Sequence, residues 1–361
     1  MSDLSCLQKD RCNVTDAAPG RFPDFSFERA THSVSLGVVF GLSIFAPMKR
    51  KTIALLALGM FATSVAEAAW DRNRLKPVSE EKKAKVLDSL PDRPLAKPKK
   101  QRRVLVFYRC EGFVHGSIAI GNYTIQELGK KTGAYLADLA DEYSVFNKET
   151  LAKYDAILFN NTTHLVFQND DQRDALIDFL KQGKGVAGIH AATDNFYKWK
   201  PGARMMGGQF DGHPWNSGGT WSFKLDDPKH VLNRAFNGKG FWLKDEIYQY
   251  KPDTFVGANE IRILISLDLS KDQTMGPLKR NDGLRKQYTE GGRYVPVSWL
   301  RKFEGGRVFY SSLGHNDSLF WNTGVLKHYL DGLQYALGDL EADATPTSKI
   351  KRTPVLAPAK P

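Results

Sequence analysis

Four histidines in this sequence occur where they could do acid/base or metal-binding chemistry. Each follows an apolar run or lies in a glycine-containing turn: His115, His190, His213 and His315. Acidic residues occur near them in the sequence, namely Asp194, Asp211, Asp245, Glu246 and Asp317. Imidazoles and carboxylates are the usual proton donors and acceptors of enzymes, and both bind divalent metals such as zinc. The set therefore predicts an acid/base site or a metal site, although a single histidine is more often a hydrogen-bonded structural residue.

No short motif fixes the metal or the reaction. The sequence has no H-E-x-x-H, no C-x-x-C and no glycine-rich phosphate loop. If a divalent metal such as zinc binds, its ligands are expected among His115, His190, His213 and His315. The other histidines of this region lack such surroundings and are interpreted as surface or packing residues: His164, His230 and His328.

The elements that must bring these side chains together alternate between strands and helices. Apolar runs predict strands over 103–110, 154–161 and 183–190. Amphipathic stretches predict helices over 117–131 and 169–182. Strands separated by helices favour a parallel sheet with helices on both faces, and the ligand site of such a sheet lies at the carboxyl ends of its strands. Polar residues follow the three strands at these ends, at His115, 160–164 and 190–194.

Five motifs in a fixed order carry a resemblance to a known family. They are GIHAATD at 188–194, GGQFDGHPW at 207–215, DEIY at 245–248, PVSW at 296–299 and GGRVFYSSLGH at 305–315. With these motifs the chain resembles the trehalose-utilisation, ThuA-like family over about residues 103–338. The resemblance implies an α/β domain over 102–340 with a flavodoxin-like sheet, related to class I glutamine amidotransferases.

The resemblance also bears on glutamine hydrolysis. In the related amidotransferases a nucleophilic cysteine occupies a tight turn between a strand and a helix, and the comparable stretch here is His190-Ala191-Ala192. Because no thiol is present there, glutamine hydrolysis is disfavoured. Cys110 follows the first predicted strand and is the one cysteine of the domain. It is interpreted as a packed, inert thiol.

The family implies a role in the use of trehalose or related disaccharides, including sugars oxidised at the third carbon. A hydrogen beside such a carbonyl is acidic, so a base can remove it while a cation or hydrogen-bond donor holds the enolate and the glycosyl group leaves. The catalytic residues expected for this chemistry are His190, Asp194, His213, Glu246 and His315. We expect His190 or His213 to be the base, with Glu246 and Asp194 as orienting partners. Hydrolysis and isomerisation are equally compatible with this set.

Sugar rings pack on flat apolar side chains, and their hydroxyl groups bind polar ones. We expect substrate contacts from His115, Thr162, Phe210, Trp215, Asp245 and Tyr248. Trp221 and Trp242 could also offer flat surfaces, whereas Trp299 lies in a strand-like run that favours core packing. The alternative function is a non-catalytic carbohydrate-binding protein, held to the cell envelope or to a polysaccharide by basic flanks.

The formal net charge is +11, and its location argues against a nucleic-acid partner. Lys and Arg are in surplus before residue 104 and after residue 340, whereas residues 104–340 are close to neutral. A basic binding face on the domain is therefore not predicted. The segments 69–101 and 341–361 are rich in proline and charge. They are predicted to be a basic linker and a disordered basic tail.

The start of the chain predicts export. Met48 is followed by three basic residues, an apolar run over 52–65 and the A-x-A site at 66–68, which is the order of a signal peptide. The run is shorter than the roughly 18 residues of a membrane-spanning helix. We therefore expect a signal peptide over 48–68 and a periplasmic or secreted protein, with no stable membrane insertion of the mature chain.

The residues before Met48 are interpreted as a spurious extension over 1–47. They show no clear helical or strand period up to Arg29. An apolar hairpin of 34–47 with 55–62 in a membrane is the alternative, and the basic residues between the two stretches disfavour it. The oligomeric state is left open.

Overall fold

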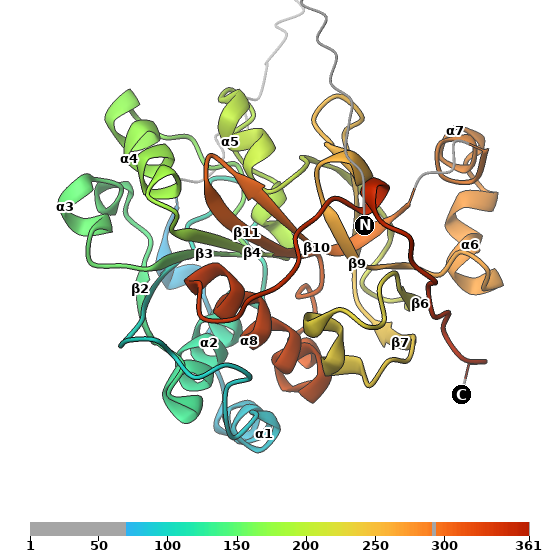
Figure 1. Cartoon of the computed structure of the whole chain (residues 1–361), viewed down its shortest axis with the longest axis horizontal. Helices are drawn as coiled ribbons and strands as arrows, with labels where there is room; N and C mark the ends of the chain where they lie inside the picture. Colours follow the sequence, from blue (N-terminus) through green and yellow to red (C-terminus); the bar gives the residue numbers. More distant parts are fainter. Residues whose placement is uncertain (1–69, 291–293, 361) are drawn as a thin grey trace, which may run out of the picture. The chain divides into compact units, whose positions relative to one another are not determined.

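A computed structural model describes residues 70–290 and 294–360 (Figure 1). These residues all belong to one structural unit. The proposed extension over 1–47 and the signal peptide over 48–68 lie outside the described residues, and both stay predictions. Within the described ranges, no helix has the length and apolar character that crossing a bilayer requires.

The apolar runs of the sequence form a nine-stranded sheet at the centre of this unit. In spatial order its strands are β2 (Leu136–Ala140), β1 (Arg103–Phe107), β3 (Ala156–Asn160), β4 (Gly185–Ile189), β11 (Gly306–Ser311), β10 (Pro296–Phe303), β9 (Arg262–Leu267), β6 (Thr220–Leu225) and β7 (Phe241–Lys244). Neighbours from β2 to β11 are parallel, and neighbours from β11 to β7 are antiparallel. A separate antiparallel pair is formed by β5 (Phe210–Trp215) and β8 (Ile247–Tyr250).

The parallel half has the strand order of flavodoxin. Its strands follow each other as β2, β1, β3, β4 and β11, which is the doubly wound order with a reversal between the first and third strands. Every position of β3 and β4 is buried, as expected for parallel strands with helices on both faces. The predicted α/β class is confirmed. The antiparallel half was not predicted, because its strands come after Trp199, where the sequence loses a regular period.

Helices cover both faces of the sheet (Figure 1). One face carries α1 (Glu80–Ser89), α2 (Ile118–Thr132) and α8 (Thr323–Leu337), and the other carries α3 (Lys148–Leu151), α4 (Asp170–Lys181) and α5 (Lys200–Met205). The remaining helices, α6 (Asp272–Lys279) and α7 (Asp282–Arg285), lie beside the antiparallel strands. Each face has its own apolar cluster, with Leu326 of α8 in one and Phe179 of α4 in the other. Packing of helices on both faces thus fixes the positions of the strand ends.

The two flanks are ordered, which corrects the prediction of a linker and a disordered tail. In the first flank, Val86 of α1 and Leu90, the residue after this helix, are buried in the apolar cluster to which α2 and α8 also contribute. In the second flank, Val355 forms an antiparallel bridge with Leu225 of β6. A highly charged segment can still place a narrow apolar stripe against a domain, and composition alone does not reveal such a stripe.

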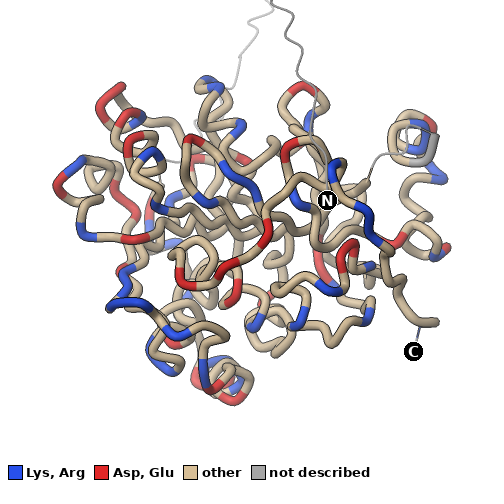
Figure 2. Tube along the Cα trace, in the orientation of Figure 1, with Lys and Arg blue, Asp and Glu red and all other residues tan. Residues whose placement is uncertain are grey.

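Ion pairs also join the first flank to the domain. Lys and Arg are interspersed with Asp and Glu along the described chain (Figure 2). Arg102 pairs with Asp339 at 2.6 Å and with Asp155 at 3.1 Å, and Lys82 pairs with Asp317 at 2.6 Å. Part of the positive charge before residue 104 therefore holds the flank against the acidic groups of the domain.

Candidate metal centre

Three of the four candidate histidines converge with one glutamate at the carboxyl ends of the parallel strands. His115 follows β1, His190 follows β4, His315 follows β11, and Glu246 lies between β7 and β8. One ligand atom from each of the four lies within 4.8 Å of the others. The expectation that strand ends would bring the histidines together therefore agrees with the placement of three of them. Below, these four residues are called the histidine cluster.

His190 is held in its place by two hydrogen bonds. Its backbone is left-handed, with a φ of 48°, which costs a non-glycine residue about 1–3 kcal/mol. The hydroxyl group of Tyr310 donates to the His190 carbonyl oxygen at 2.7 Å, and His190 Nδ1 lies 2.7 Å from the carbonyl oxygen of Ser312. Because a carbonyl oxygen only accepts, Nδ1 carries a proton, so in the neutral ring the lone pair lies on Nε2. His190 is thus prepared to act as a ligand through Nε2.

Nε2 of His190 faces the other members of the cluster. It lies 3.3 Å from Nδ1 of His315 and 3.6 Å from Oε2 of Glu246. His315 Nδ1 is also 3.3 Å from the same glutamate oxygen. Burial alone would raise the pKa of Glu246, but His190 and His315 outweigh it and hold this pKa well below its usual range. Glu246 is therefore an ionised carboxylate among imidazoles.

His115 completes the cluster as a neutral imidazole. It is 3% exposed, and its Nε2 lies 3.3 Å from the hydroxyl group of Tyr248. Burial, with His190 and His315 nearby, lowers the pKa of His115 well below its usual value. Among the described residues its Nδ1 has no hydrogen-bond partner, and such unsatisfied buried atoms often mark a missing ion or water. Three imidazoles and one carboxylate form a donor set that zinc accepts.

His213 lies beside the cluster and is not part of it, which corrects the expected set of four histidine ligands. Its side chain is 53% exposed, and its Nδ1 lies 3.4 Å from Oε1 of Glu246. The ring of Phe210 stacks on it at a centroid distance of 6.0 Å. Tyr248 packs against both Phe210, at 4.4 Å, and His190, at 4.3 Å. Phe210 and Tyr248 thus border the site, and their expected substrate contacts stay predictions.

Asp245 holds the loop that carries His315. It is fully buried, and its two oxygens accept hydrogen bonds at 2.8 Å from the backbone N–H groups of Gly314 and Asn316. Burial raises the pKa of Asp245 to about 6. Gly314 has a φ of 133°, and a Cβ there would come within 2.6 Å of Ile189. Asp245, expected to contact substrate, is therefore a positioning residue.

Three further expected site residues lie away from the cluster. Asp194 is hydrogen-bonded by Tyr197 and lies 3.5 Å from His164 Nε2, so it does not orient His190. Thr162 accepts a hydrogen bond from Asn195 at 2.9 Å and fixes a loop. Trp215 is fully buried, and its indole N–H donates to the Thr274 carbonyl oxygen at 2.8 Å. The catalytic role of Asp194 and the substrate contacts of Thr162 and Trp215 therefore have no support in the geometry.

The remaining candidates are structural. His230 and His328 are buried and hydrogen-bonded, as their interpretation as packing residues requires. Trp299 is fully buried, as expected from its strand. Burial raises the pKa of the Cys110 thiol to about 11, which keeps it protonated and unreactive near neutral pH.

The sequence did not indicate the opening next to the cluster. A hollow of about 440 Å³ is lined by His315 together with Ser117, Lys244 and Trp321. Lys85 of α1 lies 5.5 Å from the ring of Trp321, so the first flank borders this opening. Trp321 follows the last histidine motif by six positions in the sequence, and no motif distinguished it. The cluster thus has access to solvent beside an aromatic side chain.

Known proteins are similar to this region of the chain. The profile of the ThuA family, described as trehalose utilisation, matches residues 103–336. A solved structure described as a ThuA-like protein from Bacteroides uniformis is 19% identical, with a TM-score of 0.49 over 67% of this chain and 94% of that one. Another, from Parabacteroides merdae, is 14% identical, with a TM-score of 0.47 over 72% and 97%. No curated protein matches the chain.

Proposed function

The chain belongs to the ThuA family, described as trehalose utilisation, and from this premise we propose that it is a carbohydrate-processing enzyme whose reaction site is the histidine cluster. The family description suggests a carbohydrate-related role. The observation that carries the proposal is the convergence of His115, His190, Glu246 and His315 within 4.8 Å at the carboxyl ends of the strands. Doubly wound sheets bind their ligands at this edge.

These four residues are proposed to hold one divalent metal ion, with zinc as the best match to the donors. A bound divalent ion would polarise a carbonyl oxygen of the substrate. The lone pair of His190 Nε2, the neutral ring of His115 and the ionised Glu246 are what such a site requires. The Ser312 carbonyl oxygen orients the His190 ring, and the Tyr310 hydroxyl group holds the His190 backbone.

His213 is the best-placed base. Its Nδ1 faces Glu246 at 3.4 Å, so that nitrogen can donate to the carboxylate and leave Nε2 to accept a proton. Its side chain is half-exposed, whereas that of His190 is fully buried. Of the two bases expected from sequence, only His213 can therefore reach a substrate, because the buried His190 would first have to leave the cluster.

The proposed substrate is a glycoside oxidised to a ketone at its third carbon. His213 takes the proton from the second carbon, and the electron pair forms a double bond to the first carbon as the bond to the leaving glycosyl oxygen breaks. The protonated His213 then returns its proton to that oxygen. A rate gain of about 10²–10⁴-fold is typical of such a base.

Metal analysis joined to an activity assay tests this function. We expect the purified chain to bind about one divalent ion, because the cluster has one set of four donors. A chelator should abolish elimination from an oxidised glycoside, and added zinc should restore it. Glu246→Gln should lower both metal content and turnover, whereas His164→Gln, at the same sheet edge but outside the cluster, should change neither.

Full turnover by the metal-free chain would contradict the proposal. Tight binding of a sugar without any turnover, in the metal-loaded chain, would instead favour the non-catalytic carbohydrate-binding function.

We also propose that the chain is exported, on the strength of the signal-peptide pattern after Met48. Cleavage after Ala68 should leave a mature chain that begins near Ala69. Amino-terminal sequencing of the protein recovered from the periplasm or medium measures this directly. Recovery of exported protein that still carries residues 1–47 would show that both the cleavage site and the assumed start are wrong.

A further inference from the structure

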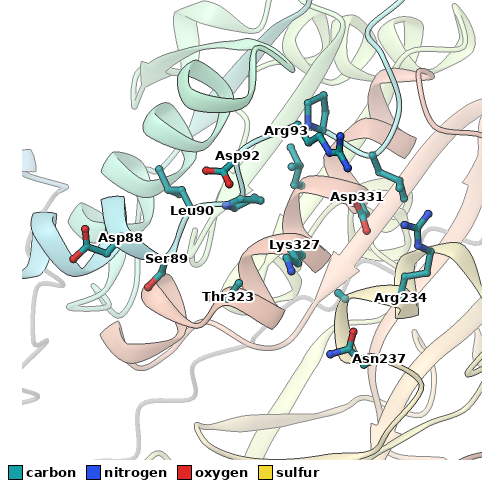
Figure 3. A pocket seen from close by; sticks show the side chains of 15 residues that line it. Asp88, Ser89, Leu90, Asp92, Arg93, Arg234, Asn237, Thr323, Lys327 and Asp331 are labelled. Carbon is teal, nitrogen blue, oxygen red and sulfur yellow. The ribbon is translucent and has the colours of Figure 1, made fainter.

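A polar pocket lies between the end of α1, the 3-10 helix η4 (Val231–Phe236) and α8 (Figure 3). Its volume is about 500 Å³, within the roughly 300–1,000 Å³ of pockets that hold small molecules. The residues that line it include none of the histidine cluster. It is therefore separate from the proposed reaction site, and only the choice of a carbohydrate as its ligand rests on the proposed function.

Besides the acids Asp88, Asp92 and Asp331, three basic side chains line this pocket. They are Arg93 from the segment after α1, Arg234 of η4 and Lys327 of α8, all exposed. Within residues 70–290 and 294–360, none of the three side chains forms an ion pair or a hydrogen bond. Asp92, which also lines the pocket, is paired with Lys131 at 3.0 Å. Because no direct ion pair engages them, these guanidinium and ammonium groups are available to bind an anionic group of a ligand.

One buried acid faces the same cations. Asp331 of α8 is 6% exposed and has no hydrogen bond or ion pair to any described residue. Figure 3 shows it near Arg93 and Arg234 at one end of the pocket, with Asp88 at the other end. Burial raises the pKa of Asp331 to about 7, although Arg234 and Lys327 act to lower it. With no hydrogen-bond partner among the described residues, the carboxyl group of Asp331 can bind a hydroxyl group of a ligand or water in the pocket.

We propose that this pocket is a second binding site, for a small carbohydrate that carries a carboxylate or phosphate group. Guanidinium and ammonium groups form charge-assisted hydrogen bonds with both anions, so the charged group binds among Arg93, Arg234 and Lys327. A sugar hydroxyl group then reaches Asp331. A neutral sugar would leave the three cations without a partner, and a bare anion would leave Asp331 without one.

Calorimetric titrations of the full purified chain at low salt test the ligand class. The probes are glucuronate, glucose 6-phosphate, inorganic phosphate and glucose. We expect at least one of the two charged sugars to bind at one site, about tenfold or more tighter than glucose, because glucose cannot form the charge-assisted bonds. The tighter of the two shows whether the natural ligand carries a carboxylate or a phosphate. Failure of both charged sugars to bind, or equal affinity for glucose, would overturn the proposal.

Variants locate the ligand. Arg234→Gln and Lys327→Gln should each weaken binding of the charged sugar by about tenfold, through loss of one charge-assisted bond. Lys239→Gln, at an exposed cation near η4 that does not line the pocket, should leave binding unchanged. Asp331→Asn should retain the affinity for inorganic phosphate and should no longer bind the charged sugar more tightly than inorganic phosphate. Melting temperatures check that each variant is folded, and unchanged affinity in both Arg234→Gln and Lys327→Gln would refute the site.

Discussion

His190→Gln and His213→Gln should each lower kcat/KM for an oxidised glycoside by about 10²–10⁴-fold, but for different reasons. His190 belongs to the cluster, so its loss should also remove the bound metal. His213 touches the cluster only through Glu246, at 3.4 Å, so its loss should remove turnover and leave the metal content intact. Steady-state kinetics with metal analysis of both variants measures the difference.

The matched control is His230→Gln, a buried histidine bonded to a backbone carbonyl oxygen at 3.1 Å and outside the cluster. It should retain turnover if it folds, and circular dichroism of all three variants tests folding. Because the buried His190 could also be needed for stability, His315→Gln offers a second test of the cluster at a partly exposed position. Wild-type turnover in both His213→Gln and His315→Gln would refute the reaction site.

Deleting residues 70–98 should greatly lower the stability of the domain, contrary to what the charge of this segment suggests. The deletion removes Val86 and Leu90, which are 0% and 4% exposed in the main apolar cluster. Leu90→Ala alone should lower the free energy of unfolding by about 2–5 kcal/mol. For a domain of this size that corresponds to a fall in melting temperature of roughly 5–20 °C.

Thermal unfolding followed by circular dichroism measures both changes. Lys97→Ala provides the control, because Lys97 is an exposed residue of the same segment and surface substitutions change stability by less than about 0.5 kcal/mol. An unchanged melting temperature after the deletion would show that the flank does not contribute to the core.

The strands whose sequence has a strong hydrophobic pattern could be predicted from the sequence. The runs 103–110, 154–161 and 183–190 contain β1, β3 and β4, because uninterrupted apolar residues are typical of buried parallel strands. β2 was missed because its exposed and half-exposed residues alternate weakly over Leu136–Ala140. α1 was missed because seven of its ten residues are charged or Ser, although Ser79 caps it and two acids begin it.

The site was predictable only as far as strand order determines it. His115, His190 and His315 each follow a parallel strand, so topology alone brings them to one edge. Glu246 and His213 come from the turn before β8 and from β5, and the relative position of these elements depends on tertiary packing. Trp215 shows the same limit for aromatic residues, because its sequence motif is equally compatible with a sugar platform and with the buried position that it occupies.

The pairing of β4 with β11 has a consequence for synthesis on the ribosome. Ser311 of β11 lies opposite Ile189 of β4, so more than a hundred residues must be made after β4 before its second edge can be covered. Until then the nascent chain presents an apolar strand, Gly185–Ile189, with unpaired backbone groups, which is a template for aggregation. A chain that is released from the ribosome before β11 has been made would keep this edge of β4 uncovered. Long-range pairing of this kind also slows folding, which favours engagement of the growing chain by chaperones.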